Sequence, residues 1–257
     1  MKPVYAAKLG QSAPPLGGPR GEPRGAPRIR PVTPERARCL EALARMVLRV
    51  ERPHPVRVAI DGPDAAGKTT LADELAPLIE RSGRPAIRAS IDDFHRPRRE
   101  RIARGSESPA GYFHDSFDYT ELRAALLDPL GPGGSREFRR RIFDIRTDKP
   151  VTAPVEVAPA RAILVFDGVF LLRRELIDCW DFSVFLAVPF AETGRRAVAR
   201  DLTLFGDEEE VLRRYAARYI PGQQLYFSQA HPLEKADAVV HNEDPDRPRL
   251  RLGSAFA

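Results

Sequence analysis

Residues 56–79 read VRVAIDGPDAAGKTTLADELAPLI, and this stretch decides the fold. The apolar run at 56–60 predicts a buried strand, and apolar residues at helical spacing within 67–80 predict a helix. Between them, residues 62–69 have the spacing GxxxxGKT of a phosphate-binding P-loop. Strand, glycine-rich loop and helix come in the order that this motif requires. We therefore favour a P-loop over a glycine-rich turn that binds nothing.

Each part of this loop has a predicted task. Gly62 and Gly67 permit close backbone approaches that a Cβ would obstruct, so successive N–H groups and the helix dipole face an anion. Lys68 is expected to reach the terminal phosphates of ATP, and the hydroxyl of Thr69 is expected to ligate Mg²⁺. The predicted nucleotide-binding residues of the loop are Gly62, Asp64, Ala65, Ala66, Gly67, Lys68, Thr69 and Thr70.

Strand and helix patterns alternate along the rest of the chain. Further strands are expected at 86–90, 162–166, 183–188 and 237–241, and helices at 33–50, 117–127, 192–200 and 208–219. Strands interleaved with helices predict a parallel sheet with crossover helices on both faces. We expect an α/β, three-layer P-loop NTPase fold with a central parallel sheet, a lid, and a β-hairpin inserted at 136–157.

The two ends of the chain differ from its centre. Residues 1–32 are rich in Pro, Gly and Arg, and such a segment buries too little apolar surface to fold, so we expect a disordered tail. A basic arm that contacts a partner is the alternative. The P-loop domain is expected to span 33–245, followed by a C-terminal tail at 246–257.

The composition limits the classes of partner and the cellular compartment that we expect. The 257 residues include 41 Lys+Arg and 36 Asp+Glu, a formal net charge of +5. No dense Lys/Arg run with interleaved aromatic residues accompanies this excess, so we do not expect a nucleic-acid partner. The two cysteines have no metal-ligand spacing and favour a reducing compartment. We expect no signal peptide and no membrane span, hence a cytoplasmic protein; homo-oligomerisation stays open.

Acidic residues follow two of the predicted strands. Asp167 ends the run AILVFD and has Walker-B character, which would let it hold Mg²⁺ through water; an Asp-Gly turn is the alternative. Asp92 and Asp93 follow the strand at 86–90, and either is a candidate base for an acceptor hydroxyl. Arg96 and Arg98 are candidates to clamp phosphate or substrate. A helix cap and solvated arginines are the alternative for this cluster.

From residue 56 to residue 242 the chain resembles the uridine kinase and phosphoribulokinase group of P-loop kinases. The motifs that carry the resemblance are GPDAAGKTT, SIDDFH, DSFDY, FDIRTD, FDGVF and ADAVVHNED. The resemblance implies that Asp92 is the base for a ribose 5′-hydroxyl, with Lys68 and Asp167 as its catalytic partners. The substrate residues it implies are Asp92, Phe94, His95, Asp115, Phe117, Phe143 and Asp148. Gln223, in the mixed polar and aromatic segment 218–227, either faces the substrate as well or belongs to a turn of the chain.

The chain departs from the uridine kinase pattern at several positions. His95 and Phe143 stand where the family has tyrosine, and Asp148 stands where it has histidine. The family lid has two arginines after an Arg-Asp pair; here Arg200 is retained, but Phe205 and Asp207 occupy the later positions. We expect Arg196 and Arg200 to bind ATP phosphates. Other candidate replacements for the missing arginines are Arg195, Arg213, Arg214 and Arg218.

These features predict an ATP- and Mg²⁺-dependent kinase that transfers the γ-phosphate to a hydroxyl of a nucleoside. The acceptor alternative is another alcohol, such as nicotinamide riboside, pantothenate or a specialised metabolite. An alternative from a different class is a nucleotide-binding switch whose basic tail engages a partner. The switch predicts slow turnover that small alcohols do not accelerate.

Overall fold

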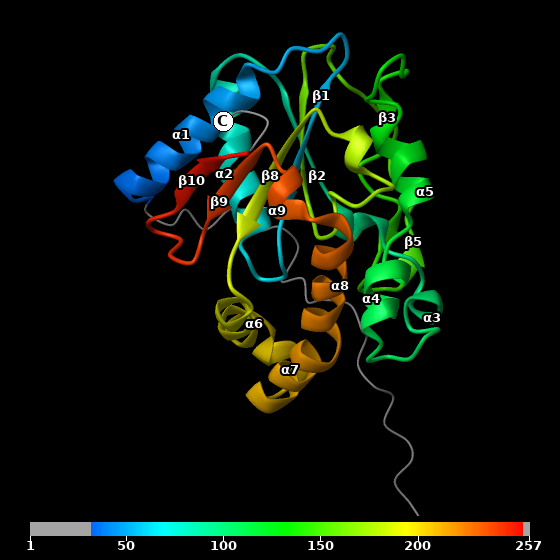
Figure 1. Cartoon of the computed structure of the whole chain (residues 1–257). Helices are drawn as coiled ribbons and strands as arrows, with labels where there is room; N and C mark the ends of the chain where they lie inside the picture. The colour runs from blue at the N-terminus through cyan, green and yellow to red at the C-terminus, as the bar shows by residue number, and fades with distance from the viewer. Residues whose placement is uncertain (1–31, 254–257) are drawn as a thin grey trace, which may run out of the picture.

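The computed structural model describes residues 32–253 of the chain. The main sheet contains β1 (Val56–Asp61), β2 (Ala86–Ser90), β7 (Ile163–Asp167), β8 (Phe182–Ala187), β9 (Ala238–His241) and β10 (Arg249–Leu252). The strand order is β10-β9-β8-β1-β7-β2, and neighbouring strands are parallel except for β9 and β10. This arrangement confirms the predicted α/β fold with a central parallel sheet (Figure 1).

β1 occupies the centre of the sheet, between β7 and β8. Every residue of β1 and β7 is buried, as expected for strands covered on both faces; the one basic residue of β1, Arg57, is paired with Asp181. The parallel register pairs Ile60 with Asp167, so the start of the P-loop and the predicted Walker-B acid leave the sheet side by side. From β1 the chain passes to β2 on one side and later to β8 on the other. Ligands bind at such a switch point in open α/β sheets.

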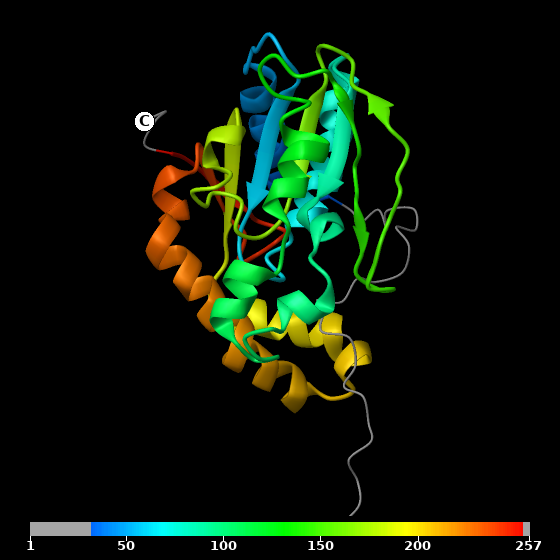
Figure 2. The ribbon, with the colours of Figure 1, turned by 90° about the vertical axis from the view of Figure 1, so that its right-hand side faces the viewer.

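Helices cover both faces of the sheet (Figure 2). α1 (Pro34–Leu48) and α2 (Lys68–Arg81) pack on one face through apolar side chains such as Leu43 and Leu75. The expected start of α1 is confirmed, because the Thr33 side chain accepts a hydrogen bond from the amide of Arg36. On the other face, residues of α4 (Pro109–Asp115), α5 (Tyr119–Leu122), η2 (Arg123–Leu127) and α8 (Ile220–Ala230) share a core with β7.

Two nested ribbons precede β7. β3 (Glu137–Phe138) pairs with β6 (Glu156–Val157), and β4 (Phe143–Asp144) pairs with β5 (Lys149–Pro150), both antiparallel. The hairpin predicted at 136–157 is therefore confirmed. The ribbons lie along the β2 edge of the sheet, where Arg140 donates to the carbonyl of Arg88 and the amide of Ile142 donates to the carbonyl of Asp93 (Figure 2).

A helical segment follows β8. It consists of α6 (Phe190–Phe205), α7 (Glu208–Arg214), the π-helical turn η4 (Tyr215–Tyr219) and then α8. Gly206, with φ of 93°, ends α6, and Asp207 caps α7 by accepting from the amide of Glu210. α6 and α7 lie beyond the end of the sheet, at the position predicted for a lid (Figure 1). The remaining short helices are η1 (Ile91–Phe94), α3 (Arg98–Arg101), η3 (Ile177–Cys179) and α9 (Pro232–Lys235).

A tail is predicted at residues 246–257, but part of this segment forms a strand. Residues 249–252 form β10, an antiparallel edge strand whose Arg249 pairs with His241 of β9. The alternating segment RLRL has only four residues, and its hydrogen-bonded partner in the sheet is β9. The predicted N-terminal tail lies outside the described residues except for residue 32. Within 32–253, no helix has both the length and the apolar character needed to cross a membrane.

Candidate active site

The P-loop joins β1 to α2 in a constrained arc. Gly62 has φ of 150°, and a Cβ there would lie 2.7 Å from the carbonyl oxygen of Leu186. Gly67, with φ of 95°, caps the start of α2. Ala65 adopts a left-handed φ of 57°, which costs a residue with a Cβ roughly 1–2 kcal/mol. Such strain persists where the surroundings fix the backbone, and it is concentrated at ligand sites.

Side chains from distant elements hold the loop in this shape. Asn242, after β9, donates through Nδ2 to the carbonyl of Ala66 at 2.8 Å. Gln223 of α8 accepts from the amide of Asp64 at 2.9 Å, and Tyr112 donates to Oδ2 of Asp64 at 2.7 Å. Neither Asn242 nor Tyr112 was predicted as a site residue from the sequence. Two signals were available for Asn242: it lies in the motif ADAVVHNED, and it directly follows the last parallel strand.

Asp61 anchors the beginning of the loop. Its carboxylate is fully buried and accepts hydrogen bonds from the amides of Gly62, Leu171 and Leu172 and from the hydroxyl of Tyr226. Burial raises the pKa of Asp61 to about 6, although these hydrogen bonds act to lower it. No role for Asp61 was predicted from the sequence.

Lys68 is the first residue of α2, and its ammonium group donates to the carbonyl of Pro63 at 2.7 Å. Burial lowers the pKa of Lys68, while the nearby carboxylates of Asp64, Asp61 and Asp167 act to raise it. A further anion at this position would stabilise the charged form. The site is therefore chemically suited to the terminal phosphates of a nucleotide.

Thr69 and Asp167 meet at the predicted metal position. The hydroxyl of Thr69 donates to Oδ2 of Asp167 at 2.6 Å, and the hydroxyl of Ser90 lies 3.4 Å from the same oxygen. Asp167 is 2% exposed. Mg²⁺ prefers oxygen ligands and is usually bound by one or two carboxylates together with phosphates and waters. These residues fit Mg²⁺: Thr69 and Asp167 would hold it beside the nucleotide phosphates.

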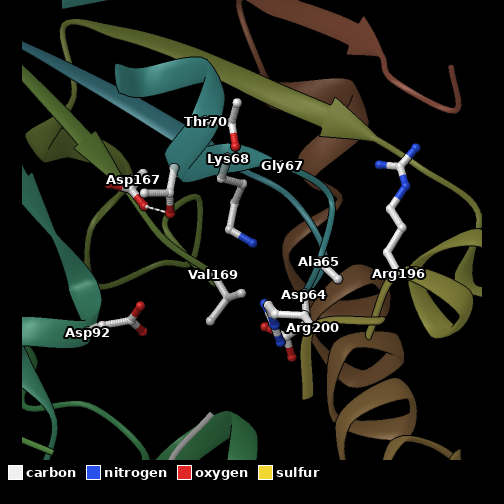
Figure 3. A pocket seen from close by; sticks show the side chains of 11 residues that line it. Asp64, Ala65, Gly67, Lys68, Thr70, Asp92, Asp167, Val169, Arg196 and Arg200 are labelled. Carbon is white, nitrogen blue, oxygen red and sulfur yellow. Dashed lines mark hydrogen bonds between the residues drawn. The ribbon is translucent and has the colours of Figure 1, made fainter. Parts of the chain in front are cut away.

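These groups surround a cavity of about 300 Å³. Lys68 and Asp92 approach it from different elements (Figure 3). The residues that line it are Asp64, Ala65, Gly67, Lys68, Thr69, Thr70, Asp92, Asp167, Val169, Arg196 and Arg200. Gly62 and Ala66, also predicted to bind the nucleotide, do not line this cavity and instead shape the backbone of the loop. We call it the P-loop cavity.

A second cavity of about 50 Å³ adjoins the first. Its lining residues are Asp64, Asp92, His95, Tyr112, Phe117, Val169, Arg200, Asp201, Tyr215 and Tyr219. Burial raises the pKa values of Tyr112, Tyr215 and Tyr219, so their hydroxyls stay neutral at physiological pH. Aromatic walls with neutral polar groups suit an organic ligand. We call this space the aromatic cavity.

Asp92 lies where the two cavities meet. It belongs to η1, directly after β2, and it lines both the P-loop cavity and the aromatic cavity. Asp93 lines neither. Nearby, the ring of His95 lies 4.4 Å from that of Phe117 and shares the aromatic cavity with it. Of the two acids that follow β2, Asp92 is thus the one that borders both cavities.

The two arginines predicted to bind ATP differ in their surroundings. Arg200 lines both cavities and is held by Asp201, at 2.6 and 3.0 Å, and by the hydroxyl of Tyr215 at 2.8 Å. Burial acts to lower the pKa of Arg200, but Tyr215 and Asp201 outweigh it and raise the pKa. Arg196 donates to the carbonyls of Asn242 and Glu243 at 2.7 and 2.8 Å. Arg196 therefore fixes the loop after β9, at one side of the P-loop cavity.

Several residues predicted to bind substrate do not line either cavity. They are Phe94, Asp115, Phe143, Asp148 and Gln223. Phe94 and Phe143 are 0% and 4% exposed and serve as packing residues. Asp115 pairs with Arg104 at 2.7 Å, and Asp148 accepts from the amide of Arg98 at 2.8 Å and from Arg101 at 3.1 Å. Gln223 instead positions the P-loop, and Arg96 donates to the carbonyl of Phe117.

A third cavity, of about 250 Å³, lies beyond the aromatic cavity and shares Tyr219 with it. Four arginines line it, from α3 and from the α7–η4 segment: Arg98, Arg213, Arg214 and Arg218. Among the described residues, Glu107 is the one acid in its wall, and it pairs with Arg213; Glu210, outside the wall, pairs with both Arg213 and Arg214. We call it the arginine cavity.

Comparison with known proteins places this geometry among the P-loop kinases. No protein-family model matches the chain, and no curated protein matches its sequence. Among solved structures, a candidate fructose transport system kinase from Silicibacter sp. TM1040 aligns with a TM-score of 0.64 and 26% identity, over 74% of this chain and 95% of its own. The protein has the fold of the P-loop kinases.

Two further structures agree on the fold. A candidate uridine kinase from Bacillus stearothermophilus has a TM-score of 0.63 and 22% identity, covering 79% of this chain and 97% of its own. D-glycerate 3-kinase from Cryptococcus neoformans has a TM-score of 0.51 and 14% identity, covering 77% and 86%. These kinases are named for different small molecules. The comparisons therefore support a small-molecule kinase without selecting an acceptor.

Proposed function

We propose that the protein is an ATP-dependent phosphotransferase that moves the γ-phosphate to a hydroxyl of a small, nucleoside-like molecule. The observation that carries this proposal is the position of Asp92 on the shared wall of the P-loop cavity and the aromatic cavity. A base for phosphoryl transfer must reach the acceptor hydroxyl while that oxygen lies in line with the γ-phosphate. A base at the boundary between two adjoining cavities meets this requirement.

The other residues divide the remaining tasks. Lys68 and the amides of the P-loop bind and orient the phosphates, and Arg200 faces both cavities, where it would stabilise charge on the transferred group. Mg²⁺, when bound at Thr69 and Asp167, neutralises charge on the phosphates. α6 and α7 carry Arg200 and its neighbours and would exclude water when they close over the site.

A nucleoside-like acceptor is supported by the chemistry of the aromatic cavity. Tyr112, Tyr215, Tyr219 and Phe117 present ring faces and edges, which suit a planar heterocycle. The hydroxyls of Tyr112 and Tyr215 donate to Asp64 and Asp201, so toward a sugar these oxygens would act as hydrogen-bond acceptors, beside the imidazole of His95. The resemblance of the motifs around Asp92 to those of uridine kinases points to the same acceptor class.

A second acceptor class is favoured by the size and charge of the cavities. The aromatic cavity, at about 50 Å³, is far smaller than the roughly 300–1,000 Å³ of typical small-molecule sites, so a nucleoside would need α6 and α7 to move. The arginine cavity next to it is larger and is lined by four arginines, of which Arg98 and Arg218 come from outside the ion pairs with Glu107 and Glu210. A short alcohol with a carboxylate or phosphate group would place its hydroxyl near Asp92 and its anion among these arginines.

The test is to measure ADP release by the purified protein with Mg²⁺-ATP and each member of a panel of acceptors. One set contains nucleosides; another contains short alcohols with an acid group, each paired with its amide. Acceleration by uridine or cytidine would support the nucleoside kinase. Acceleration by acids but not by their amides would replace it with the second class. Nucleotide binding without acceleration by any acceptor would favour the nucleotide-binding switch instead.

A further inference from the structure

Arg88 of β2 reaches two carboxylates with one guanidinium group. Nη2 donates to Oδ1 of Asp167 at 2.9 Å and lies 2.9 Å from Oδ1 of Asp73, and Nε donates to that same Asp73 oxygen at 3.0 Å. Nη1 donates to the carbonyl of Val165 at 2.6 Å. The Arg88 side chain is 13% exposed and that of Asp167 is 2% exposed. A well-buried cation therefore adjoins the predicted metal ligand.

The sheet register explains why these groups meet. β2 and β7 are parallel with Arg88 opposite Val165 and Ser90 opposite Asp167, so the side chains of Arg88, Ser90 and Asp167 project from the same face. α2 covers that face, and Thr69 and Asp73 are one helical turn apart on it. Contacts thus run from Thr69 to Asp167, from there to Arg88, and back to α2 at Asp73.

We propose that Arg88 is a positioning residue that compensates the charge of Asp167 before nucleotide binds, so that the site rejects free Mg²⁺ and accepts it only with the nucleotide phosphates. The reason is electrostatic. A bare divalent cation at Thr69 and Asp167 would be repelled by the adjacent guanidinium. The complex of Mg²⁺ with ATP carries net negative charge, so the same guanidinium attracts it. This inference rests on the proposed nucleotide site but not on the identity of the acceptor.

A purely mechanical role for Arg88 predicts a different result. If the side chain only joined β2 to α2, loss of its charge would loosen Asp167 and weaken metal binding. If compensation is its role, loss of the charge leaves Asp167 as a stronger ligand, and binding of the free metal becomes tighter. The sign of the change in metal affinity therefore separates the two roles.

The experiment measures binding of free Mn²⁺ to the full chain by electron paramagnetic resonance, without nucleotide. For Arg88→Gln we expect the dissociation constant to fall about tenfold, because one adjacent positive charge is removed. Arg88→Lys, which keeps the charge, should stay within about threefold of the wild type by the same reasoning. Adding Asp167→Asn to Arg88→Gln should abolish the gain in Mn²⁺ affinity, and this result would locate the metal at Asp167. Unchanged or weaker binding by Arg88→Gln would overturn the proposal.

A measurement on the wild-type protein tests the proposal even if a variant fails to fold. The proposal expects Mn²⁺ to bind at least about a hundredfold more tightly with a non-hydrolysable ATP analogue than without it, because the phosphates reverse the local charge. Equal affinity in both conditions would overturn the proposal whatever the variants do. Neither measurement needs turnover, so the absence of kinase activity would count against the proposed function and leave this inference to be judged by metal binding.

Discussion

The hydroxyl of Thr69 donates a hydrogen bond of 2.6 Å to Oδ2 of Asp167, a residue 98 positions later in the chain. The contact follows from the sheet: β1 and β7 are paired with Ile60 opposite Asp167, and the P-loop carries the chain from β1 to Thr69 at the start of α2. The two oxygens proposed to hold Mg²⁺ are thus brought together by the fold itself. The proposed phosphate site and the proposed metal site consequently share the segment that joins β1 to α2.

Asp92→Asn should abolish phosphoryl transfer while nucleotide binding persists. The asparagine amide cannot take the proton from the hydroxyl of the acceptor molecule. Because general-base catalysis contributes roughly 10²–10⁴-fold to the rate, we expect kcat to fall by about that factor. Affinity for an ATP analogue should change by less than about threefold, because the P-loop supplies most of the phosphate contacts. Asp93→Asn is the matched control, since Asp93 lines neither cavity. Equal losses in both variants would remove Asp92 from its proposed role.

Arg200→Lys should slow transfer although it keeps the positive charge. The guanidinium of Arg200 contacts both carboxylate oxygens of Asp201 and the hydroxyl of Tyr215, and an ammonium group cannot reproduce that planar geometry. We expect kcat to fall about 10–100-fold, because a charge-stabilising donor is displaced. Arg195→Lys, at a side chain that is 77% exposed in the same helix, should have little effect. Steady-state kinetics of ADP release would compare them, and wild-type rates for Arg200→Lys would contradict the assignment.

The parts of the site that the sequence predicted are those encoded locally. The P-loop residues follow one another in the chain. Asp167 ends β7 and Asp92 lies two residues after the end of β2, and the carboxyl ends of these strands meet at one edge of the sheet. Phe94 and Phe143 lie in motifs that resemble substrate-binding motifs of uridine kinases, but their apolar rings pack in the interior. A motif does not distinguish an aromatic residue that faces a ligand from one that faces the core.

The parts that the sequence did not predict depend on pairing between distant segments. Arg88 meets Asp167 because β2 lies beside β7 in a particular register, which the short run AIRAS cannot specify. Asn242 and Tyr226 reach the P-loop and Asp61 across 176 and 165 residues. β10 forms because β9 offers it an edge. In each case the contact forms between segments distant in the sequence, and local sequence propensity does not predict it.

Two glycine-to-alanine substitutions in helices should have opposite effects on stability. A Cβ at Gly222 of α8 would lie 2.7 Å from Cδ1 of Tyr112 and 3.0 Å from the carbonyl of Pro109, whereas a Cβ at Gly194 of α6 meets nothing within 4 Å. We expect Gly222→Ala to lower the free energy of unfolding by about 1–3 kcal/mol through overpacking. Gly194→Ala should raise it by up to about 1 kcal/mol through helix propensity.

Denaturant unfolding of both alanine variants would check this pair. Tyr112 also binds Asp64 and lines the aromatic cavity, so Gly222→Ala should reduce turnover as well. Gly194→Ala serves as its control for the general effect of adding a methyl group to a helix. A stabilising effect of Gly222→Ala would mean that the ring of Tyr112 moves freely, and would weaken the assignment of a fixed wall to the aromatic cavity.

Tyr226→Phe should destabilise the protein more at neutral pH than at acidic pH. The pKa of Asp61 in the folded protein, about 6, lies above its ordinary value of 3.8, so the folded state binds the proton more tightly than the unfolded chain. The contribution of Asp61 to the free energy of unfolding therefore falls as pH rises from about 4 to about 6 and is constant above that range. The hydroxyl of Tyr226 limits this fall, because it donates to the ionised carboxylate.

Removal of the Tyr226 hydroxyl raises the pKa of Asp61 further, so the free energy of unfolding continues to fall as pH rises toward neutral. A hydrogen bond to a charged group contributes about 1.5–3 kcal/mol, against about 0.5–1.5 kcal/mol for a neutral pair, so we expect a loss of about 2 kcal/mol at pH 7.5 and about 1 kcal/mol at pH 5. Urea unfolding at the two pH values would measure both. Tyr119→Phe is the control: its hydroxyl binds Arg173, and the pKa of Tyr119 is about 12, so its effect should not vary between pH 5 and 7.5. Equal losses for Tyr226→Phe at both pH values would mean that Asp61 does not titrate in this range, and that the start of the P-loop rests on a carboxylate that stays ionised.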